Sequence, residues 1–359
     1  MNASFWKKKR VFVTGHTGFK GSWMCLWLQS LGAEVVGYAL PPPTNPNLFN
    51  IANVASGMFS IMGDIRDFEK LRKEILESGA EVVFHMAAQS LVTASYDDPL
   101  ETYSTNVMGT VHILEAVRQS PSVRACIVVT SDKCYENLEW VWGYRENDRM
   151  GGYDPYSNSK GCAELVVSAY RSSYFNPKDF GRHKMALASA RAGNVIGGGD
   201  WATNRLVPDI LRAFENKKPV TIRNPQSIRP WQHVLEPVGG YMLLAQKLLE
   251  RGSEMAEAWN FGPDDGDSKS VQWIVEKMIS MWREKSSYRV ENTNPLHEAH
   301  YLKLDCSKAL ISLGWTPKWG LTRALEEVVS WHQDYLSGQE MRERTLMQIQ
   351  RYQELLSIA

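Results

Sequence analysis

The sequence of 359 residues is poor in cysteine and has no excess of charge of either sign. Its five cysteines are widely spaced and form no Cys-x-x-Cys pair, which excludes a disulfide framework and a zinc site and indicates reduced thiols. With 40 basic and 40 acidic residues, the formal net charge is zero, so no global field attracts nucleic acid or an anionic membrane. We therefore expect neither as a partner.

Long apolar runs are missing as well. No run approaches the length of a membrane span, and residues 1–10 lack the apolar stretch of a signal peptide. We therefore expect a cytoplasmic protein. The spacing of His233, His297 and His300 is not that of metal ligands, so we expect no metal.

The N-terminal half alternates short β-branched or apolar runs with amphipathic segments. This alternation is typical of βαβ units around a parallel sheet. The predicted strands cover residues 11–14, 34–39, 81–85, 126–130 and 185–191. The predicted helices cover residues 23–31, 68–77, 99–118 and 155–174.

The composition changes after residue 192, where Gly, Pro, Trp and Arg become more frequent. We expect an α/β fold, with a Rossmann-type doubly wound parallel sheet in a domain over residues 1–192. A smaller C-terminal lobe, residues 193–359, should mainly bind substrate, and the chain should return to the first domain around residues 233–260. Helices 99–118 and 155–174 carry apolar residues on more than one face, which suggests packing on a second subunit.

A glycine-rich turn of the form G-x-x-G-x-x-G follows the first predicted strand and opens a helix: Gly15-His16-Thr17-Gly18-Phe19-Lys20-Gly21. Glycine permits the tight turn and lets backbone N–H groups approach a pyrophosphate, which the helix dipole also attracts. The position after the first strand favours a dinucleotide site over an ordinary glycine-rich turn. Residues 36–40 offer neither an acidic side chain for the adenosine ribose nor an arginine for a 2′-phosphate, so these residues leave NAD and NADP as alternatives.

Tyr156 and Lys160 are four residues apart in a predicted helix, so their side chains project from one face. A neighbouring ammonium lowers the pKa of a phenol, so Tyr156 is predicted to take a proton from a sugar hydroxyl while hydride leaves for a nicotinamide. Alone, the pair is a weak signal, because any helix can carry it by chance. Together with the glycine-rich turn and the hydroxyl pair Thr130-Ser131 after an intervening strand, it indicates a catalytic site.

These motifs resemble the extended short-chain dehydrogenase/reductase family over nearly the whole chain. The resemblance implies bound NAD, a nucleotide-sugar substrate and a homodimer formed through helices 99–118 and 155–174. It matches Ser131, Tyr156 and Lys160 to the family's catalytic hydroxyl, phenol and lysine. It also implies an adenine contact from Asp64 and Ile65, and a cofactor cleft lined by Ala87, Ala88, Gln89 and Asn106.

Three later segments fit the same family. Residues 191–197 resemble its substrate-phosphate strand, residues 229–234 its diphosphate-binding arginine segment, and residues 313–317 its C-terminal signature. A protein of zero net charge must meet phosphate with local guanidinium or amide donors. We therefore predict that the substrate diphosphate is bound by Asn194, Arg205 and Arg229.

The residues after the catalytic hydroxyl separate the reactions of this family. Epimerases generally lack an acid and base pair here, whereas 4,6-dehydratases usually carry Asp and Glu. This chain carries Asp132 and Lys133. The resemblance implies that Asp132 protonates the leaving 6-hydroxyl, and Lys133 becomes the hypothetical base for the C5 proton. Alternatively, Lys133 only pairs with a carboxylate or steadies the enolate, and Glu136 is a second candidate base if the local turn brings it round.

Four segments are similar to the 4,6-dehydratases that act on CDP-D-glucose: residues 15–23, 131–137, 197–201 and 229–234. This likeness implies CDP-4-keto-6-deoxy-D-glucose and water as the products. Two alternatives remain open. One is a 4-epimerase, against which Asp132 argues, and the other is a non-catalytic dinucleotide sensor, against which Ser131, Tyr156 and Lys160 argue.

Overall fold

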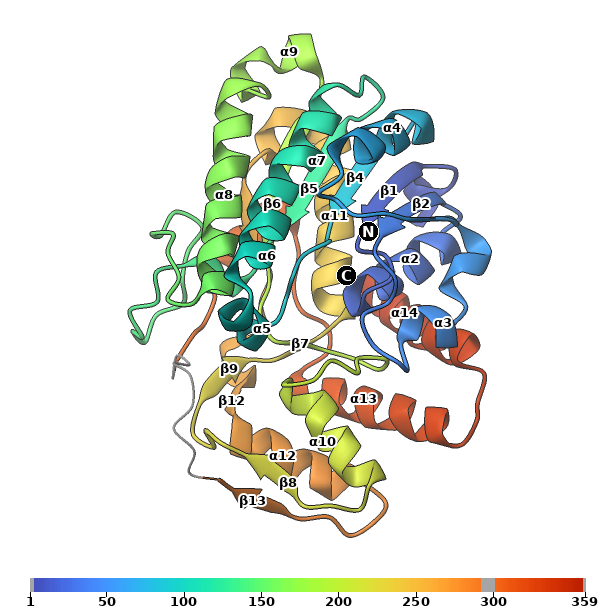
Figure 1. The fold of residues 1–359 in the computed structure, drawn as a ribbon, viewed down its shortest axis with the longest axis vertical. Helices are drawn as coiled ribbons and strands as arrows, with labels where there is room; N and C mark the ends of the chain where they lie inside the picture. The colour runs from blue at the N-terminus through green and yellow to red at the C-terminus, as the bar shows by residue number, and fades with distance from the viewer. Residues whose placement is uncertain (1–2, 292–300, 358–359) are drawn as a thin grey trace.

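A seven-stranded, wholly parallel sheet forms the centre of the computed structural model, which describes residues 3–291 and 301–357 (Figure 1). Its strand order is β11-β6-β5-β4-β1-β2-β3. The strands are β1 (Arg10–Thr14), β2 (Glu34–Ala39), β3 (Phe59–Met62), β4 (Val82–His85), β5 (Ala125–Val129), β6 (Ala186–Arg191) and β11 (Ala258–Asn260). The expected Rossmann-type α/β fold is therefore confirmed, and the strand order reverses between β1 and β4.

Alternate residues of each central strand face two different helix layers, as the period of two along a strand requires. Val11 and Val13 pack in the core beneath α2 (Phe19–Ser30) and α11 (Leu235–Arg251). Phe12 packs in the opposite core, which α4 (Phe68–Ser78), α7 (Gly109–Arg118) and α8 (Pro155–Ser173) cover. Because both faces are covered, β4, β5 and β6 are buried along their whole length, which explains their continuous apolar sequences.

The predicted helix 99–118 is divided in the structure. It begins as α6 (Pro99–Tyr103), widens into a π-turn over Ser104–Met108 and continues as α7. Asn106 lies in the π-turn and is buried. Such π-turns often occur at functional sites because they redirect a side chain from a regular helix.

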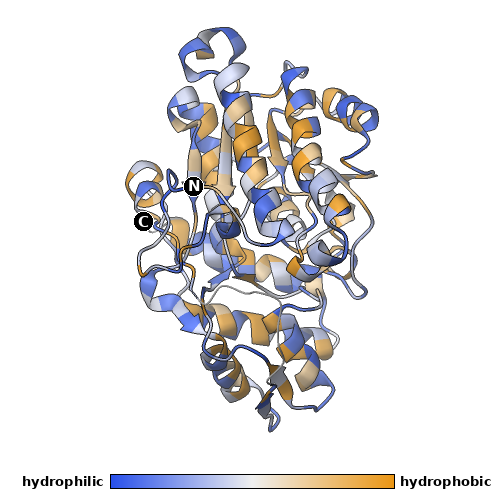
Figure 2. Cartoon of the chain, turned by 60° about the vertical axis from the view of Figure 1, so that its left-hand side comes forward, coloured by the Kyte–Doolittle hydropathy of each residue, from blue (hydrophilic) through white to orange (hydrophobic). Residues whose placement is uncertain are grey.

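A smaller lobe lies beneath the sheet, at the carboxyl ends of the strands (Figure 1). Its helices are α10 (Leu206–Glu215), α12 (Val271–Met281) and α13 (Leu321–Leu336), and it has a hydrophobic core of its own. Its short strands pair as β8 (Val220–Ile222) with β13 (Tyr288–Val290), and β9 (Ile228–Pro230) with β12 (Ser268–Ser270). A third pair, β7 (Val195–Ile196) and β10 (Gln232–His233), lies near the sheet. Figure 2 shows hydrophobic residues concentrated in the strands and on the helix faces turned toward them.

The chain returns to the sheet after residue 230. Helix α11 covers one face, and β11 adds the edge strand beside β6. The last helix, α14 (Met341–Ser357), packs on α2 through the rings of Tyr352 and Trp27, whose centres are 5.6 Å apart. Within the two described ranges, no helix has the length and apolar character needed to cross a membrane.

Candidate active site

The predicted cofactor and catalytic residues follow the carboxyl ends of β1, β4 and β5, which are neighbours in the sheet. In a parallel sheet these ends meet at one edge, and ligands bind where the strand order reverses. The turn from Gly15 follows β1, Ala87 follows β4, and Ser131 follows β5. The fold therefore brings together three segments that are far apart in the sequence.

The glycine-rich turn is pressed against the loop after β4. Gly15 has φ +75°, and a Cβ there would lie 2.7 Å from the backbone nitrogen of Ala87. A Cβ at Gly21 would lie 2.1 Å from the carbonyl oxygen of Gly15, whereas at Gly18 it would meet only that oxygen, at 3.3 Å. Gly18 caps α2 without a side chain. The N-terminus of α2 therefore has the shape and the positive dipole that fit a dinucleotide pyrophosphate.

Several predicted cofactor residues are held by partners within the protein. His16 is fully buried, its Nε2 lies 2.8 Å from the Ser60 hydroxyl, and burial lowers its pKa to about 4. Its ring therefore points beneath β3 and stays neutral. The Asp64 carboxylate pairs with the Arg66 guanidinium, which lowers the pKa of Asp64. Thr17 donates a hydrogen bond to the backbone oxygen of Leu40 at 2.8 Å.

Asn106 fixes the loop that contains Ala87, Ala88 and Gln89. Its Oδ1 accepts a hydrogen bond from the Gln89 backbone N–H at 2.9 Å, and its Nδ2 donates to the Gln89 carbonyl at 3.0 Å. The same nitrogen donates to the Ser159 hydroxyl of α8 at 2.8 Å. The Asn106 side chain thus joins the predicted cofactor loop to the helix that carries Tyr156.

Ser131 and Asp132 form a hydrogen-bonded pair at the end of β5. The Ser131 hydroxyl donates to Asp132 Oδ1 at 2.9 Å and accepts from the Lys133 backbone N–H at 3.2 Å. Asp132 is 1% exposed, and among the described residues its Oδ2 has no hydrogen-bond partner. A buried carboxylate oxygen without a donor is costly, which makes it a candidate contact for a bound polar ligand.

Tyr156 and Lys160 both lie in the first two turns of α8, and both are buried. The helix begins at Pro155, and the Asp154 carboxylate caps it through Ser157 at 2.9 Å to N and 2.6 Å to Oγ. Acid and proline at these two positions stabilise a helix N-terminus. The cap therefore fixes where Tyr156 enters the site.

The prediction that Lys160 lowers the pKa of Tyr156 toward neutrality is wrong for this structure. The pKa of Tyr156 is raised to about 12, mainly by burial and also by Asp132 and Asp154, while a hydrogen bond to Ser131 and the charge of Arg205 act in the opposite direction. The cause is desolvation of the phenolate, which outweighs the neighbouring positive charges. Burial also lowers the pKa of Lys160, to about 8. Its ammonium lies 3.4 Å from the Val129 carbonyl oxygen.

Lys20 is turned toward the catalytic residues. Its Nζ lies 5.9 Å from the centre of the Tyr241 ring of α11. The pKa of Lys20 is lowered to about 7, mainly by burial and also by the charges of Lys160 and Arg205, and Asp132 acts in the opposite direction. The turn therefore contributes a titrating amine to the site as well as backbone N–H groups.

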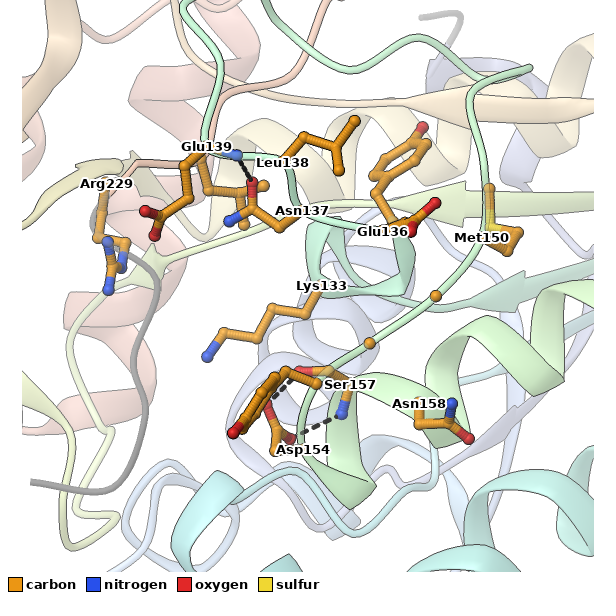
Figure 3. A pocket seen from close by; sticks show the side chains of 15 residues that line it. Lys133, Glu136, Asn137, Leu138, Glu139, Met150, Asp154, Ser157, Asn158 and Arg229 are labelled. Atoms are coloured by element: carbon orange, nitrogen blue, oxygen red, sulfur yellow. Dashed lines mark hydrogen bonds between the residues drawn. The ribbon is translucent and has the colours of Figure 1, made fainter.

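A cavity of about 750 Å³ opens beside this cluster. Lys133 projects into it, with Arg229 on one wall and Asp154 below, as Figure 3 shows. Residues 135–139 and 150–153 complete much of the lining, so Glu136 faces the same cavity. The volume suits a drug-sized or nucleotide-sized ligand.

The three predicted diphosphate residues lie around this region in different settings. Arg229 is 7% exposed and lines the cavity. Arg205 is held by Asp200 at 3.0 Å and by the Ser90 hydroxyl at 3.0 Å, which joins the second lobe to the loop after β4. Asn194 follows β6 with φ +40°.

Comparisons with known proteins identify the family. The profile described as GDP-mannose 4,6 dehydratase matches residues 12–328. The chain belongs to this family. It is 61% identical over 341 residues to the CDP-glucose 4,6-dehydratase of Salmonella typhimurium, which covers 95% of both chains.

Solved structures of relatives share the fold. The dTDP-glucose 4,6-dehydratase of Bacillus anthracis in complex with NAD has a TM-score of 0.74 at 22% identity, covering 93% of this chain and 99% of that one. The UDP-glucose 4-epimerase of Thermus thermophilus in complex with NAD has a TM-score of 0.76 at 23% identity, covering 90% of this chain and 99% of that one. Both dehydratases and epimerases therefore use this architecture.

The structure also contains a buried ion pair that the sequence did not predict. Arg191 at the end of β6 pairs with Glu164 of α8 at 2.7 Å, and Glu164 accepts further bonds from Thr130 at 2.5 Å and Ser189 at 2.7 Å. The only sequence signal was the position of Glu164, one helical turn after Lys160. The pair joins α8, which carries the predicted Tyr156 and Lys160, to the ends of β5 and β6.

No cluster of three or more potential metal-binding side chains occurs within residues 3–291 and 301–357. His297 and His300 lie outside the described residues. His233 is fully buried between Trp23 and Trp319, whose ring centres lie 5.7 and 4.9 Å from its own.

Proposed function

We propose that this protein is a nucleotide-sugar 4,6-dehydratase that converts CDP-D-glucose to CDP-4-keto-6-deoxy-D-glucose and water. The observation that carries this proposal is the 61% identity to the CDP-glucose 4,6-dehydratase of Salmonella typhimurium over 95% of both chains. Asp132 beside Ser131 supports dehydration, because an epimerase needs no acid for a leaving hydroxyl. The nucleotide base is assigned from the relative alone.

NAD is the cofactor in this proposal, and when bound it would accept a hydride from C4 of the hexose and return it at C6. The turn from Gly15 to Gly21 and the N-terminus of α2 fit its pyrophosphate. Asp64 and Ile65 would lie at the adenine, and Ala87, Ala88 and Gln89 along the cleft. Lys160 would hold the nicotinamide ribose together with Tyr156.

Oxidation at C4 requires a base for the hydroxyl proton. Tyr156 takes this role, Ser131 shares the sugar oxygen, and the Lys160 ammonium stabilises the phenolate that must form. Because the pKa of Tyr156 is raised to about 12, mainly by burial, nearby positive charge has to favour the phenolate during the reaction. Arg205 already lowers the pKa of Tyr156, and Lys160 lies one helical turn along the same helix.

Elimination requires an acid for O6 and a base for C5–H, whose acidity the new ketone increases. Asp132 supplies the proton to O6, and among the described residues no donor forms a hydrogen bond to its Oδ2. Lys133 reaches into the cavity and takes the C5 proton. The substrate diphosphate is bound by Arg229, Arg205 and Asn194. This binding fixes how far the attached sugar extends toward the predicted catalytic residues.

We propose that the two lobes bind different ligands. Residues 1–192, joined by residues 233–260, hold the cofactor, and residues 193–359 mainly bind the nucleotide sugar. The two-lobed core arrangement and the return of α11 and β11 to the sheet support this division.

We propose a homodimer formed through α6–α7 and α8. Large apolar side chains on these helices, on the π-turn that joins α6 to α7 and at the end of α8 are exposed: Leu100 (83%), Met108 (48%), Leu165 (60%) and Tyr174 (50%). The helices lie next to each other on one side of the molecule (Figure 1). A second copy would cover this surface. The free buried thiols of Cys25, Cys126 and Cys134 fit a cytoplasmic location.

The test of the proposed function is direct. The protein is incubated with NAD and, separately, with the glucose esters of CDP, UDP, dTDP and GDP, and the ultraviolet absorption of a 4-keto-6-deoxy sugar in alkali is measured. We expect product with CDP-glucose and little or none with the others. Isomerised sugar without a ketone would assign an epimerase, and no reaction with any ester would assign a binding protein.

A further inference from the structure

The proposed reaction does not return all side chains to their starting protonation states. O4 gives its proton to Tyr156, and Asp132 gives its proton to O6, which leaves as water. The C5 proton moves to its base and returns to C5 when C6 is reduced, so it cancels. After each turnover Tyr156 therefore holds one proton too many and Asp132 one too few, and a proton must pass from the phenol to the carboxylate.

The two groups are poorly placed to exchange this proton with bulk water. Tyr156 is 9% exposed and Asp132 is 1% exposed, and a bound sugar would cover them further. Exchange through solvent would require the site to open in each cycle. A path inside the protein avoids that requirement.

Ser131 contacts both of these groups. A serine hydroxyl can donate one hydrogen bond and accept two. It donates to Asp132 Oδ1 at 2.9 Å and accepts from the Lys133 N–H at 3.2 Å. Ser131 also forms a side-chain hydrogen bond with Tyr156, so its hydroxyl contacts both the phenol and the carboxylate. The Lys133 N–H thus orients the hydroxyl so that its own proton points at Asp132.

We propose that Ser131 returns the proton from Tyr156 to Asp132 within the protein after each turnover. The O–H bonds of Tyr156 and Ser131 break, and new O–H bonds form on Ser131 and on Asp132 Oδ1. The result is a phenolate and a carboxylic acid, the base and the acid that the next turnover needs, with the net charge of the site unchanged. No oxidant, reductant or additional reactant takes part.

This inference rests on the proposed dehydration and deepens it. In a 4-epimerase the proton taken from O4 returns to O4. Tyr156 then ends the turnover without an extra proton, and a path that passes a proton from the phenol to the carboxylate has no use. The hydrogen bond between Ser131 and Asp132 therefore has a purpose in a dehydratase that it lacks in an epimerase. The Ser131 hydrogen bond and the charge of Arg205 lower the pKa of Tyr156, which favours transfer of its proton to Asp132. Burial raises that pKa and opposes the transfer.

The experiment compares the first turnover with later turnovers by rapid quenching. Ser131→Ala removes the path, Ser131→Cys keeps the size but replaces the hydroxyl by a weak hydrogen-bonding thiol, and Ser131→Thr keeps the hydroxyl. For Ala and Cys we expect a burst of up to one product per active site, then a steady-state rate at least 10-fold below the burst rate. Imidazole or formate buffer should raise only the slow phase. Ser131→Thr should show no burst and no buffer effect.

A merely structural or sugar-binding role of Ser131 gives a different result. In that case Ala and Cys would slow the first and later turnovers by the same factor, without buffer rescue, and the relay would be wrong. If Ser131→Ala does not fold, as judged by circular dichroism, the Cys and Thr pair decides alone. Failure of the unaltered enzyme to turn over CDP-glucose would instead contradict the proposed function.

Discussion

The carboxylate of Asp132 occupies the space that a side chain at Gly193 would need. A Cβ at position 193 would lie 1.8 Å from Asp132 Oδ2 and 2.2 Å from its Cγ. No side chain can occupy that space without moving the acid. The glycine after β6 therefore helps to position the proposed catalytic acid.

Gly193→Ala should displace Asp132 and lower kcat by about 100-fold or more, because a misplaced acid loses most of its contribution. Fluorescence-monitored urea unfolding and steady-state kinetics would measure stability and activity together. Gly181→Ala is the matched control, since an added Cβ there meets nothing within 4 Å. Unchanged kcat in Gly193→Ala would contradict a catalytic position for Asp132.

Lys133→Ala should slow the exchange of the C5 proton. The 4-keto-6-deoxy product is incubated with enzyme in D₂O, and deuterium at C5 is followed by NMR, so that the C4 oxidation is not required. We expect a fall of about 100-fold or more, as for loss of a general base. Glu136→Gln is the comparison, because Glu136 lines the same cavity. Native exchange in Lys133→Ala together with lost exchange in Glu136→Gln would transfer the role to Glu136.

Glu164→Ala should destabilise the fold by about 3–5 kcal/mol, because Arg191 would remain as a buried charge without its partner. Urea unfolding measures this difference. Glu69→Ala breaks the exposed pair with Arg72 and should change the free energy of unfolding by at most about 1 kcal/mol. Equal effects of the two substitutions would refute the structural role of the buried pair.

The buried carboxyl of Glu236 should make stability depend on pH. It accepts hydrogen bonds from the Trp319 N–H at 2.7 Å and the Tyr352 hydroxyl at 2.5 Å, and burial raises its pKa from 4.5 to about 7. Because the folded pKa exceeds the unfolded one, its contribution to stability is complete below about pH 4.5 and is lost as pH rises to about 7.

Relative to Glu236→Gln, the unaltered protein should therefore lose about 3 kcal/mol of unfolding free energy between pH 4.5 and 7.5. Chemical unfolding across this range, with the exposed Glu254→Gln as control, gives the difference. A constant difference between the two proteins at all pH values would show that folding does not change the pKa of Glu236, against a raised pKa.

Leu165→Glu should convert the proposed dimer to a monomer, because a charge would be placed in the apolar surface of α8. Light scattering after gel filtration measures the mass. Ile311→Glu, at a residue that is 80% exposed and outside both helices, should leave the dimer intact. A monomeric unaltered protein would remove the dimer proposal.

Much of the sheet could be predicted because β4, β5 and β6 are buried on both faces and so have continuous apolar sequences. Predicted and observed bounds differ by about one residue. No residue range was predicted for β3, where Phe59 is 79% exposed at the sheet edge, or for β11, which has only three residues. Edge strands bury too little surface to leave a clear pattern.

The motifs predicted which segments would lie together at the candidate site, but not the electrostatics there. The spacing of Tyr156 and Lys160 predicted a shared face, and both do lie together on α8. The pKa of Tyr156 depends on burial by distant segments and on Arg205, which the structure places nearby. Likewise, nothing in the turn sequence distinguished the inward amine of Lys20 from a solvated one.

The edge strand β11 and the covering helix α11 come from beyond residue 230, and α14 closes over α2 from the very end of the described chain. The lobes are consequently interleaved along the polypeptide. A hybrid that borrows the sugar-binding lobe of a relative would have to exchange separate stretches of sequence and spare those that complete the sheet. Exchanging all residues after 192 in one piece would also replace α11 and β11, which belong to the core of the first domain.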